Sequence, residues 1–276
     1  MNNKRIFCFW EPPERMPGYL KACMKTWRLA FPDFEIVCLN FSTVGNWLSK
    51  EDLDVEWVIS HYGLAQKADA FRIALLRKYG GIWLDVDTVF VSKKARDLLG
   101  SVPKLTMFGN HIACLAAPQG DAFVEHWYRL NRRRIEWHKW YQRTAPRYAQ
   151  IWQRIKRSNR FGPGQGFFMR WDYFGNAPLK VVVKHNPNCR VMLDRVALKA
   201  LPEVAVFPQL DGKAAYESLY YDRQFGDRLI QEANQGCGIV ILHNGWTPKW
   251  VKKMTEDEFM SSGLPLAKLI GTILRR

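Results

Sequence analysis

The feature that most constrains the fold of this chain is a run of apolar residues at helical spacing that stops at a pair of glycines. Between positions 64 and 79 apolar residues recur every three or four positions, which predicts a helix. Gly80-Gly81 ends it, because glycine readily adopts the left-handed conformation that closes a helix. The apolar run 82–84 then predicts a short buried strand. A helix that leads into a buried strand is typical of α/β folds.

The same alternation of extended and helical segments continues along the chain. Strands are predicted at 4–10, 35–39, 52–59, 82–84, 88–91, 180–183, 204–207 and 238–242. Helices are predicted at 17–30, 64–79, 121–141 and 264–274. A further helix is predicted to follow Pro146 and to run to about 157. We therefore expect an α/β fold with a mainly parallel sheet and C-terminal helices. The simplest organisation is a single domain over 1–276 with a helical, basic and aromatic insertion at 121–160.

Charge is the outstanding feature of the composition. The chain carries 41 Lys and Arg against 26 Asp and Glu, a formal charge of +15, which implies an anionic partner. Between 131 and 160 there are ten Lys or Arg and one Glu, a net charge of +9, interleaved with aromatic residues. This stretch is either a solvated helix face or a surface that binds an anionic membrane.

The sequence also contains no membrane-spanning signal. No apolar run approaches the ~20 residues that a spanning helix needs, and the first ten residues lack the apolar core of a signal peptide. We therefore expect a cytoplasmic protein, with peripheral attachment to the cytoplasmic face of the inner membrane through 131–160. The six cysteines form no C-x-x-C pair and are expected to be free thiols.

Two carboxylates follow the predicted strand 82–84. Asp85 and Asp87 are two positions apart in an extended segment, so they point the same way about 7 Å apart. A divalent cation is the usual partner of such a pair, and oxygen ligands suit Mg²⁺ or Mn²⁺. A second Asp-x-Asp triplet, Asp52 and Asp54, lies among other acidic residues and is interpreted as a solvated cluster.

Further polar residues adjoin this pair. Asp69 and Arg72 share one face of the preceding helix, as either a surface ion pair or part of a site. His243 is the first polar residue after the apolar strand 238–242. If that strand ends at the same sheet edge as 82–84, the imidazole joins the carboxylates, a mixed set that favours Mn²⁺.

Together these motifs resemble a known family. The Asp-x-x-Arg helix, the Gly-Gly-x-aromatic-x-Asp-x-Asp turn and the late His-x-x-Trp are similar to the DXD motif-containing sugar transferases of glycosyltransferase family 32. That family includes bacterial capsule and lipooligosaccharide transferases, with clostridial toxin glucosyltransferases as distant relatives. The tight match covers about 25 residues, 66–90. The resemblance implies a GT-A fold, a nucleotide-sugar donor, a divalent metal and retention of anomeric configuration.

The resemblance also implies a role for individual residues. Asp69 and Arg72 would contact the donor sugar, Asp85 the ribose or sugar side, and Asp87 with His243 would hold the metal beside Asp85. Asn110 stands where the family often places an Asn facing the donor sugar, although His111 follows it here. Phe9 and Trp10 match the element whose end lines the base pocket. The donor expected from the resemblance is a UDP-hexose, and the acceptor a glycan or a glycolipid of lipopolysaccharide type.

Two questions stay open at this point. A retaining transferase needs a group beneath the anomeric carbon, and Gln165 and Asp172 are the candidates. The rival class is a metal-dependent nucleic-acid-binding protein or nuclease, since a metal site beside a basic aromatic stretch could describe one. A nuclease explains neither Asp69 with Arg72 nor the turn at His243, which makes nucleic acid the weaker hypothesis. A lectin-like binder that keeps the fold without activity is the third.

Overall fold

The computed structural model describes residues 4–108, 111–144, 167–185, 209–235 and 238–276. The strands are β1 (Arg5–Phe9), β2 (Glu35–Leu39), β3 (Gly81–Leu84), β4 (Thr88–Phe90), β5 (Thr106–Phe108), β6 (His111–Ala117) and β7 (Ile239–Ile241). The longer helices are α1 (Gly18–Ala30), α3 (Leu64–Tyr79), α5 (Ala122–Thr144), α7 (Asn176–His185), α10 (Gly212–Tyr221), α11 (Gly226–Gln235) and α14 (Pro265–Leu274). The shorter ones are α2 (Val55–His61), α4 (Lys93–Leu99), α12 (Lys249–Lys252) and α13 (Glu256–Ser261), with 3₁₀ turns η1 (Pro13–Arg15), η2 (Val44–Asn46), η3 (Phe167–Met169) and η4 (Arg223–Phe225).

The central sheet has five strands in the order β2-β1-β3-β6-β5. β1 pairs in parallel with β2 and with β3, whereas β6 is antiparallel to both β3 and β5. Four of these five strands therefore run in one direction. The predicted α/β class with a mainly parallel sheet is confirmed, and β1, β2 and β3 end at the same edge.

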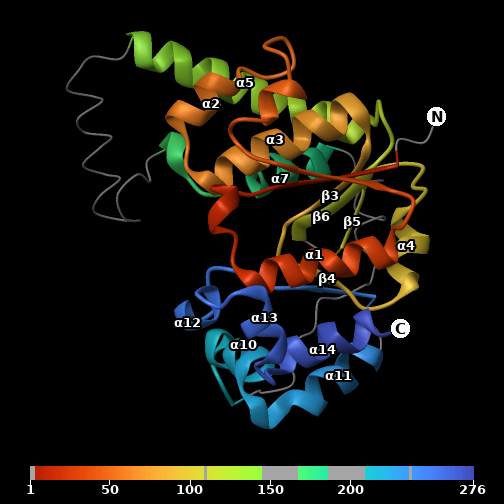
Figure 1. Cartoon of the computed structure of the whole chain (residues 1–276). Coiled ribbons are helices and arrows are strands. Elements are labelled where there is room, and N and C mark those ends of the chain that lie inside the picture. The colour runs from red at the N-terminus through yellow and green to blue at the C-terminus, as the bar shows by residue number, and fades with distance from the viewer. Residues whose placement is uncertain (1–3, 109–110, 145–166, 186–208, 236–237) are drawn as a thin grey trace.

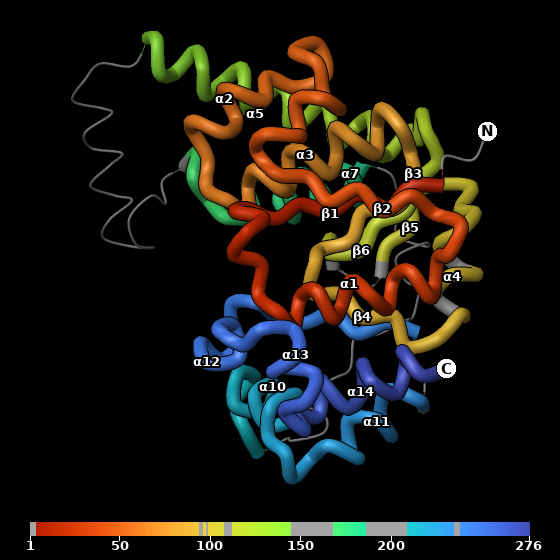
Figure 2. The backbone as a smooth tube through the Cα atoms, viewed as in Figure 1, coloured from red at the N-terminus to blue at the C-terminus, as the bar shows by residue number. Residues whose placement is uncertain are grey.

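Helices cover both faces of this sheet (Figure 1). On one face α3, α5 and α7 pack together over the side chains of Phe7 and Trp83. On the other face α1 packs over Ile6 and Leu84, and α13 and α14 pack in turn against α1. In Figure 2 the C-terminal helices lie below α1, on the side away from α3. The alternation of the strand side chains thus supplies both cores.

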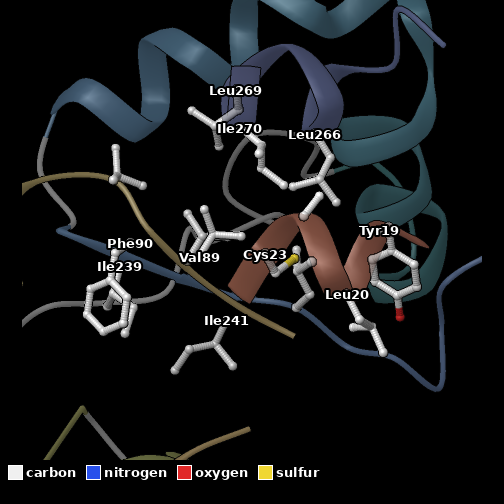
Figure 3. Close-up of a cluster of buried hydrophobic side chains, with 14 of the residues drawn as sticks. Tyr19, Leu20, Cys23, Val89, Phe90, Ile239, Ile241, Leu266, Leu269 and Ile270 are labelled. Atoms are coloured by element: carbon white, nitrogen blue, oxygen red, sulfur yellow. The ribbon is translucent and has the colours of Figure 1, made fainter. Parts of the chain in front are cut away.

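In the described part of the chain the second sheet has two strands, and it joins the N-terminal and C-terminal parts. β4 pairs antiparallel with β7, with Thr88 opposite Ile241 and Phe90 opposite Ile239. Figure 3 shows Val89, Phe90, Ile239 and Ile241 packed with Cys23 of α1 and with Leu266, Leu269 and Ile270 of α14. The Trp27 indole of α1 donates to the Thr88 carbonyl across 2.7 Å, which fixes β4 against α1.

Two strand predictions were wrong. The segment 52–59 lies largely in α2, because the Asp54 carboxylate accepts a hydrogen bond from Trp57 N at 3.2 Å and caps that helix. Asp52 is not merely solvated either, since it pairs with Lys78 at 2.6 Å. The segment 180–183 lies in α7, where Leu179 and Val182 are buried at helical spacing despite the run of three valines. The predicted strand 204–207 lies outside the described residues.

Two further expectations concern the basic segment and the cysteines. The helix predicted at 121–141 is α5, which continues through Arg134 to Thr144, and the remainder of 121–160 is outside the described residues. Cys8, Cys23, Cys38 and Cys114 are free thiols. Within the described part of the chain, no helix has the length and apolar character needed to cross a membrane.

Candidate active site

The Asp85 to Asp87 turn lies at the carboxyl end of β3. The Asp85 amide donates to the Ala113 carbonyl of β6 at 2.7 Å, and the Thr88 amide donates back to the Asp85 carbonyl at 3.1 Å. These bonds fix the backbone of the turn at both ends. The side chain of Asp85 remains 35% exposed, whereas Asp87 is buried at 9% exposure. Carboxyl ends of strands in open α/β sheets are where ligands bind.

Arg72 is the centre of the polar network behind this turn. Its Nη2 lies 2.9 Å from Asp85 Oδ1 and 3.2 Å from Asp69 Oδ1, and its Nη1 donates to the Ile112 carbonyl. The guanidinium also lies 5.1 Å from the centre of the Trp83 ring, whose indole donates to Asp85 at 2.9 Å. Arg72 is 3% exposed. The alternative of a surface ion pair is therefore wrong, because the pair is buried and holds Asp85 in place.

Asp69 lies beneath a turn that precedes α7. A Cβ added to Gly175 would lie 2.4 Å from Asp69 Oδ2, so only glycine allows this close approach. Burial raises the pKa of Asp69 to about 7, with smaller contributions from the charges of Asp85 and Asp172 and opposition from Arg72. Asp172 is itself buried, and Arg170 binds it through two contacts of 3.1 Å. The structure thus brings Asp172 to the same region as Asp69.

Asp87 meets the C-terminal part of the chain through the small sheet. Because β7 is antiparallel to β4, the residues after β7 lie beside the residue before β4: Leu242 N donates to the Asp87 carbonyl at 3.0 Å. Asn244 N then donates to Asp87 Oδ2 at 3.0 Å. The predicted strand 238–242 is present as β7, but the condition that it ends at the edge of the main sheet is not met, since β7 belongs to the second sheet. The His243 turn reaches Asp87 by antiparallel pairing instead.

The electrostatics of Asp87 favour a cation. Burial, and after it the charge of Asp85, raise its pKa to about 7 against the hydrogen bond from Asn244. His243 is partly buried, which lowers its pKa and favours the neutral, metal-binding form of the ring. Among the described residues no group of three or more His, Cys, Asp or Glu is placed to hold a metal ion. Asp85 and Asp87 offer carboxylate oxygens, which are suitable ligands for a divalent cation. The further ligands that such a cation needs would have to come from elsewhere.

The residues predicted for the base pocket lie at the end of β1. Phe9 is buried against Phe41 and Phe71, at ring-centre distances of 5.4 and 5.2 Å. The Trp10 indole N–H is buried without a hydrogen-bond partner in the described part of the chain, and Lys67 of α3 lies over the Phe41 ring at 4.8 Å. Asn110 and Gln165 lie outside the described residues.

Several residues of the site were missed at the level of sequence. Trp83 was assigned only to a buried strand, yet its indole binds Asp85. Asn244 binds Asp87 by its backbone, and its side-chain oxygen accepts from the Tyr19 hydroxyl at 2.6 Å. The charge of Asp87 also acts on Lys252 of α12, opposing the effect of burial on its pKa. The turn motif contains Trp83 as its aromatic position without indicating that its indole binds Asp85, two residues on. The contacts of Asn244 and Lys252 with Asp87 join segments far apart in the chain, so no local motif contains them.

The fold and the site together define an α/β protein with a buried Asp-Arg-Asp network behind a carboxylate pair at the sheet edge. Comparison with known families makes this more specific. The chain belongs to the capsular polysaccharide synthesis protein family, whose model matches residues 1–141. This confirms the predicted relation to capsule sugar transferases at the level of that family. The match includes the Asp-x-x-Arg helix and the Asp85 to Asp87 turn, whereas His243 lies beyond it.

Two further comparisons complete this result. Among curated proteins none matches the chain in sequence. The solved structure of the PaToxG glycosyltransferase is similar with a TM-score of 0.36 and 16% sequence identity, over 78% of this chain and 82% of that one.

The first testable prediction concerns the buried network. Arg72→Lys should lower the free energy of unfolding by about 3 kcal/mol, which is more than half of the decrease caused by Arg72→Ala. The reason is that a lysine cannot donate to two carboxylates and a carbonyl at once. Urea unfolding measures this. Arg77→Lys on the same helix is the control, since that residue is 36% exposed and its pair with Glu125 contributes under ~1 kcal/mol. Near-wild-type stability of Arg72→Lys would contradict the network.

The second prediction concerns Asp69. Its folded pKa of about 7 exceeds the ordinary value of 3.8, so its favourable contribution is full below pH 3.8 and is lost as the pH rises through 7. Asp69→Asn has no titrating carboxyl at this position, so its stability does not fall in this way. The free energy of unfolding of the variant minus that of the wild type, measured in chelator, should therefore increase by on the order of 3 kcal/mol between pH 4 and pH 8.

Unfolding by urea at several pH values measures this difference. Asp33→Asn is the control, because Lys4 lowers the pKa of that exposed carboxyl and its effect should appear only at acidic pH. A pH-independent difference for Asp69→Asn would contradict the assignment.

Proposed function

We propose that this protein is a metal-dependent, retaining sugar transferase of capsular polysaccharide synthesis. It moves a hexose from a nucleotide-diphosphate donor, a UDP-hexose, to a glycan or glycolipid acceptor. The observation that carries the proposal is the buried Asp69–Arg72–Asp85 network, which presents one partly exposed carboxylate beside the buried Asp87 at the carboxyl edge of the sheet. Membership of the capsular polysaccharide synthesis family supplies the biological context.

In this proposal each part of the site has one task. The end of β1 binds the base, where the Trp10 indole has an unused N–H among the described residues. Asp85 faces the ribose or the sugar, and Arg72 with Trp83 keeps that carboxylate oriented. The Asp69 carboxylate accepts a hydrogen bond from a sugar hydroxyl, or it orients Arg72 from beneath. Fixed groups of this kind need no reorganisation during the reaction, which is the basis of electrostatic catalysis.

The carboxylates of Asp87 and Asp85 would hold Mn²⁺ or Mg²⁺, with phosphate oxygens of the donor and water as further ligands. His243 would join them only after a movement of its side chain, since the described residues place no group of three such ligands together. Such a cation supplies Lewis-acid neutralisation of the diphosphate as the bond to the sugar breaks. Lys252, which experiences the charge of Asp87, would add positive charge on the same side. Burial, and after it the charge of Asp85, raise the pKa of Asp87, and a bound cation would offset both effects.

Retention of anomeric configuration requires a group beneath the anomeric carbon. Gln165 remains a proposal from the sequence alone. Asp172 is supported further by the structure, because it is buried, its charge acts on Asp69, and Arg170 fixes its orientation. The carboxylate of Asp172 would then stabilise the positive charge that develops on the sugar ring.

The third prediction tests this function directly. The protein should hydrolyse UDP-glucose, UDP-galactose or UDP-N-acetylglucosamine slowly without acceptor, in the presence of Mn²⁺, and lose that activity in excess chelator. Asp87→Asn should lower the rate at least 10²-fold while leaving the fold intact, because removal of one preorganised charge costs several kcal/mol in the transition state. Release of UDP measures the rate.

The matched control is Asp54→Asn in the other Asp-x-Asp triplet, where an asparagine caps α2 as well as the aspartate does. It should retain full activity. Preferential use of GDP-mannose would contradict the donor assignment. Manganese-dependent cleavage of oligonucleotides, without turnover of any nucleotide sugar, would instead establish the nuclease hypothesis.

We further propose that the exposed basic face of α5 attaches the protein to the cytoplasmic face of an anionic membrane. Arg132, Arg133 and Arg143 are exposed, and the Trp140 side chain between them is 57% exposed. Arg134 does not belong to this face, because it donates to the Tyr173 carbonyl and lies 4.8 Å from that ring. Each Lys or Arg near an anionic bilayer contributes about 1 kcal/mol to the free energy of membrane binding, and a Trp side chain at the interface adds to it.

The fourth prediction follows from this face. The protein should float with vesicles of phosphatidylglycerol and phosphatidylcholine at low salt, and not with phosphatidylcholine alone. Changing Arg132, Arg133 and Arg143 to Glu should remove flotation. The control changes Arg15, Lys21 and Arg28 to Glu, which alters net charge equally at exposed positions elsewhere. Equal loss in both triple variants would show that net charge alone, and not α5, drives binding.

A further inference from the structure

A second concave surface lies apart from the carboxylate pair, in the C-terminal part of the chain. This C-terminal cleft is shallow and open to solvent, with a volume of about 520 Å³. It lies where α10 and η4 meet α12 and the start of α14, which Figure 1 shows at the lower end of the molecule. Its lining comprises Glu217, Ser218, Tyr221, Asp222, Arg223, Gln224, Pro248, Trp250 and Leu264.

The cleft combines an aromatic wall with hydrogen-bonding groups. The Trp250 side chain borders it and is 50% exposed, which is unusual for the largest apolar side chain. Tyr221 and Leu264 are buried and form an apolar floor. Glu217 and Asp222 add carboxylates, which accept strong hydrogen bonds from hydroxyl groups.

The cleft lacks the positive charge that dominates the whole protein. Its lining has two carboxylates and one guanidinium, that of Arg223, and Lys213 pairs with Glu217 at 3.5 Å, so the cleft is close to neutral whereas the chain carries +15. Nothing in this lining concentrates the positive charge that a phosphate, an anionic lipid or a nucleic acid requires. A neutral, hydroxyl-rich ligand with one apolar face matches the lining better.

The cleft is joined to the carboxylate site through a short stretch of chain. The Tyr221 hydroxyl bonds to Thr247 Oγ1 at 3.1 Å, and Thr247 ends the turn that begins at His243. Asn244, which binds Asp87, and Trp250 are only six positions apart in the chain, a span of at most ~22 Å.

Two features of that stretch connect the sites chemically. Lys252 of α12 experiences the charge of Asp87, while Trp250 on the same short helix borders the cleft. Between them in the chain, Trp246 is 39% exposed and lies 4.7 Å from the His243 ring. The stretch that follows His243 therefore carries two exposed indoles, those of Trp246 and Trp250. This arrangement suits a ligand that occupies both regions at once.

We infer that the C-terminal cleft binds sugar residues of the acceptor glycan, with one ring stacked on Trp250 and its hydroxyls bonded to Glu217 and Asp222. The inference rests on the proposed function, since only a glycan acceptor has to reach the donor site from this cleft. Indoles provide a large rigid contact surface for the C–H face of a sugar, and carboxylates accept its hydroxyls. The cleft then holds the acceptor chain while its terminal sugar lies near Asp85.

The fifth prediction tests binding without any nucleotide. Saturation-transfer NMR with maltotetraose, cellotetraose and N-acetylchitotetraose should detect binding of at least one of these neutral tetrasaccharides. Trp250→Ala should weaken that binding at least tenfold, and Glu217→Gln severalfold. Trp140→Ala is the matched control, because it removes an equally exposed indole from α5. Inorganic phosphate at the same concentration should not displace the sugar.

The outcomes separate the cleft from the donor site. Hydrolysis of nucleotide sugars without acceptor should be unchanged in Trp250→Ala, Glu217→Gln and Trp140→Ala. Binding of no tetrasaccharide by the wild type, or equal binding by Trp250→Ala, would overturn the inference even where hydrolysis is observed. Displacement by phosphate would overturn it in favour of an anion site. Sugar binding without hydrolysis would refute the proposed function and leave the cleft as a glycan-binding site.

Discussion

The site depends on a single buried guanidinium. Arg72 lies between Asp69 and Asp85 and also binds the carbonyl of Ile112, so one side chain ties α3 to β3 and β6. Burial of these charges is unfavourable unless each is paired, which is why any loss of Arg72 leaves two carboxylates exposed to each other's repulsion. The result is a carboxylate, Asp85, whose position is set from behind while its front remains open to a ligand. Rigid placement of this kind is what a donor site needs before any metal or substrate arrives.

The second constraint is the pairing of β4 with β7. It forces the residues that follow β7 to lie against the residue that precedes β4, and this alone brings Asn244 to Asp87 across 157 positions of sequence. The family match ends at residue 141, so this half of the site is contributed by a region that the family model does not cover. The carboxylates and the groups that surround them thus come from two parts of the chain, joined by three backbone pairs.

These two interactions explain what the sequence could and could not predict. The helix at 64–79, the strand at 35–39 and the turn at Asp85 were predicted closely, because each depends on local period and glycine placement. The strand at 52–59 was wrong because the cap at Asp54 outweighed β-branched composition, and 180–183 was wrong because tertiary packing selected a helix for three valines. The role of Trp83 was missed although the motif contains it, because a motif does not show which way an indole N–H points. Asn244 and Lys252 could not be found, since their roles follow from long-range contacts with Asp87.

The surface of the protein is divided into regions of different charge. A chain of charge +15 needs neutral or acidic areas wherever an uncharged substrate has to bind, because a uniform positive field would retain phosphates and nucleic acids there. The exposed arginines of α5 and the nearly neutral C-terminal cleft are different solutions on one molecule. One suits an anionic membrane, and the other suits a neutral glycan.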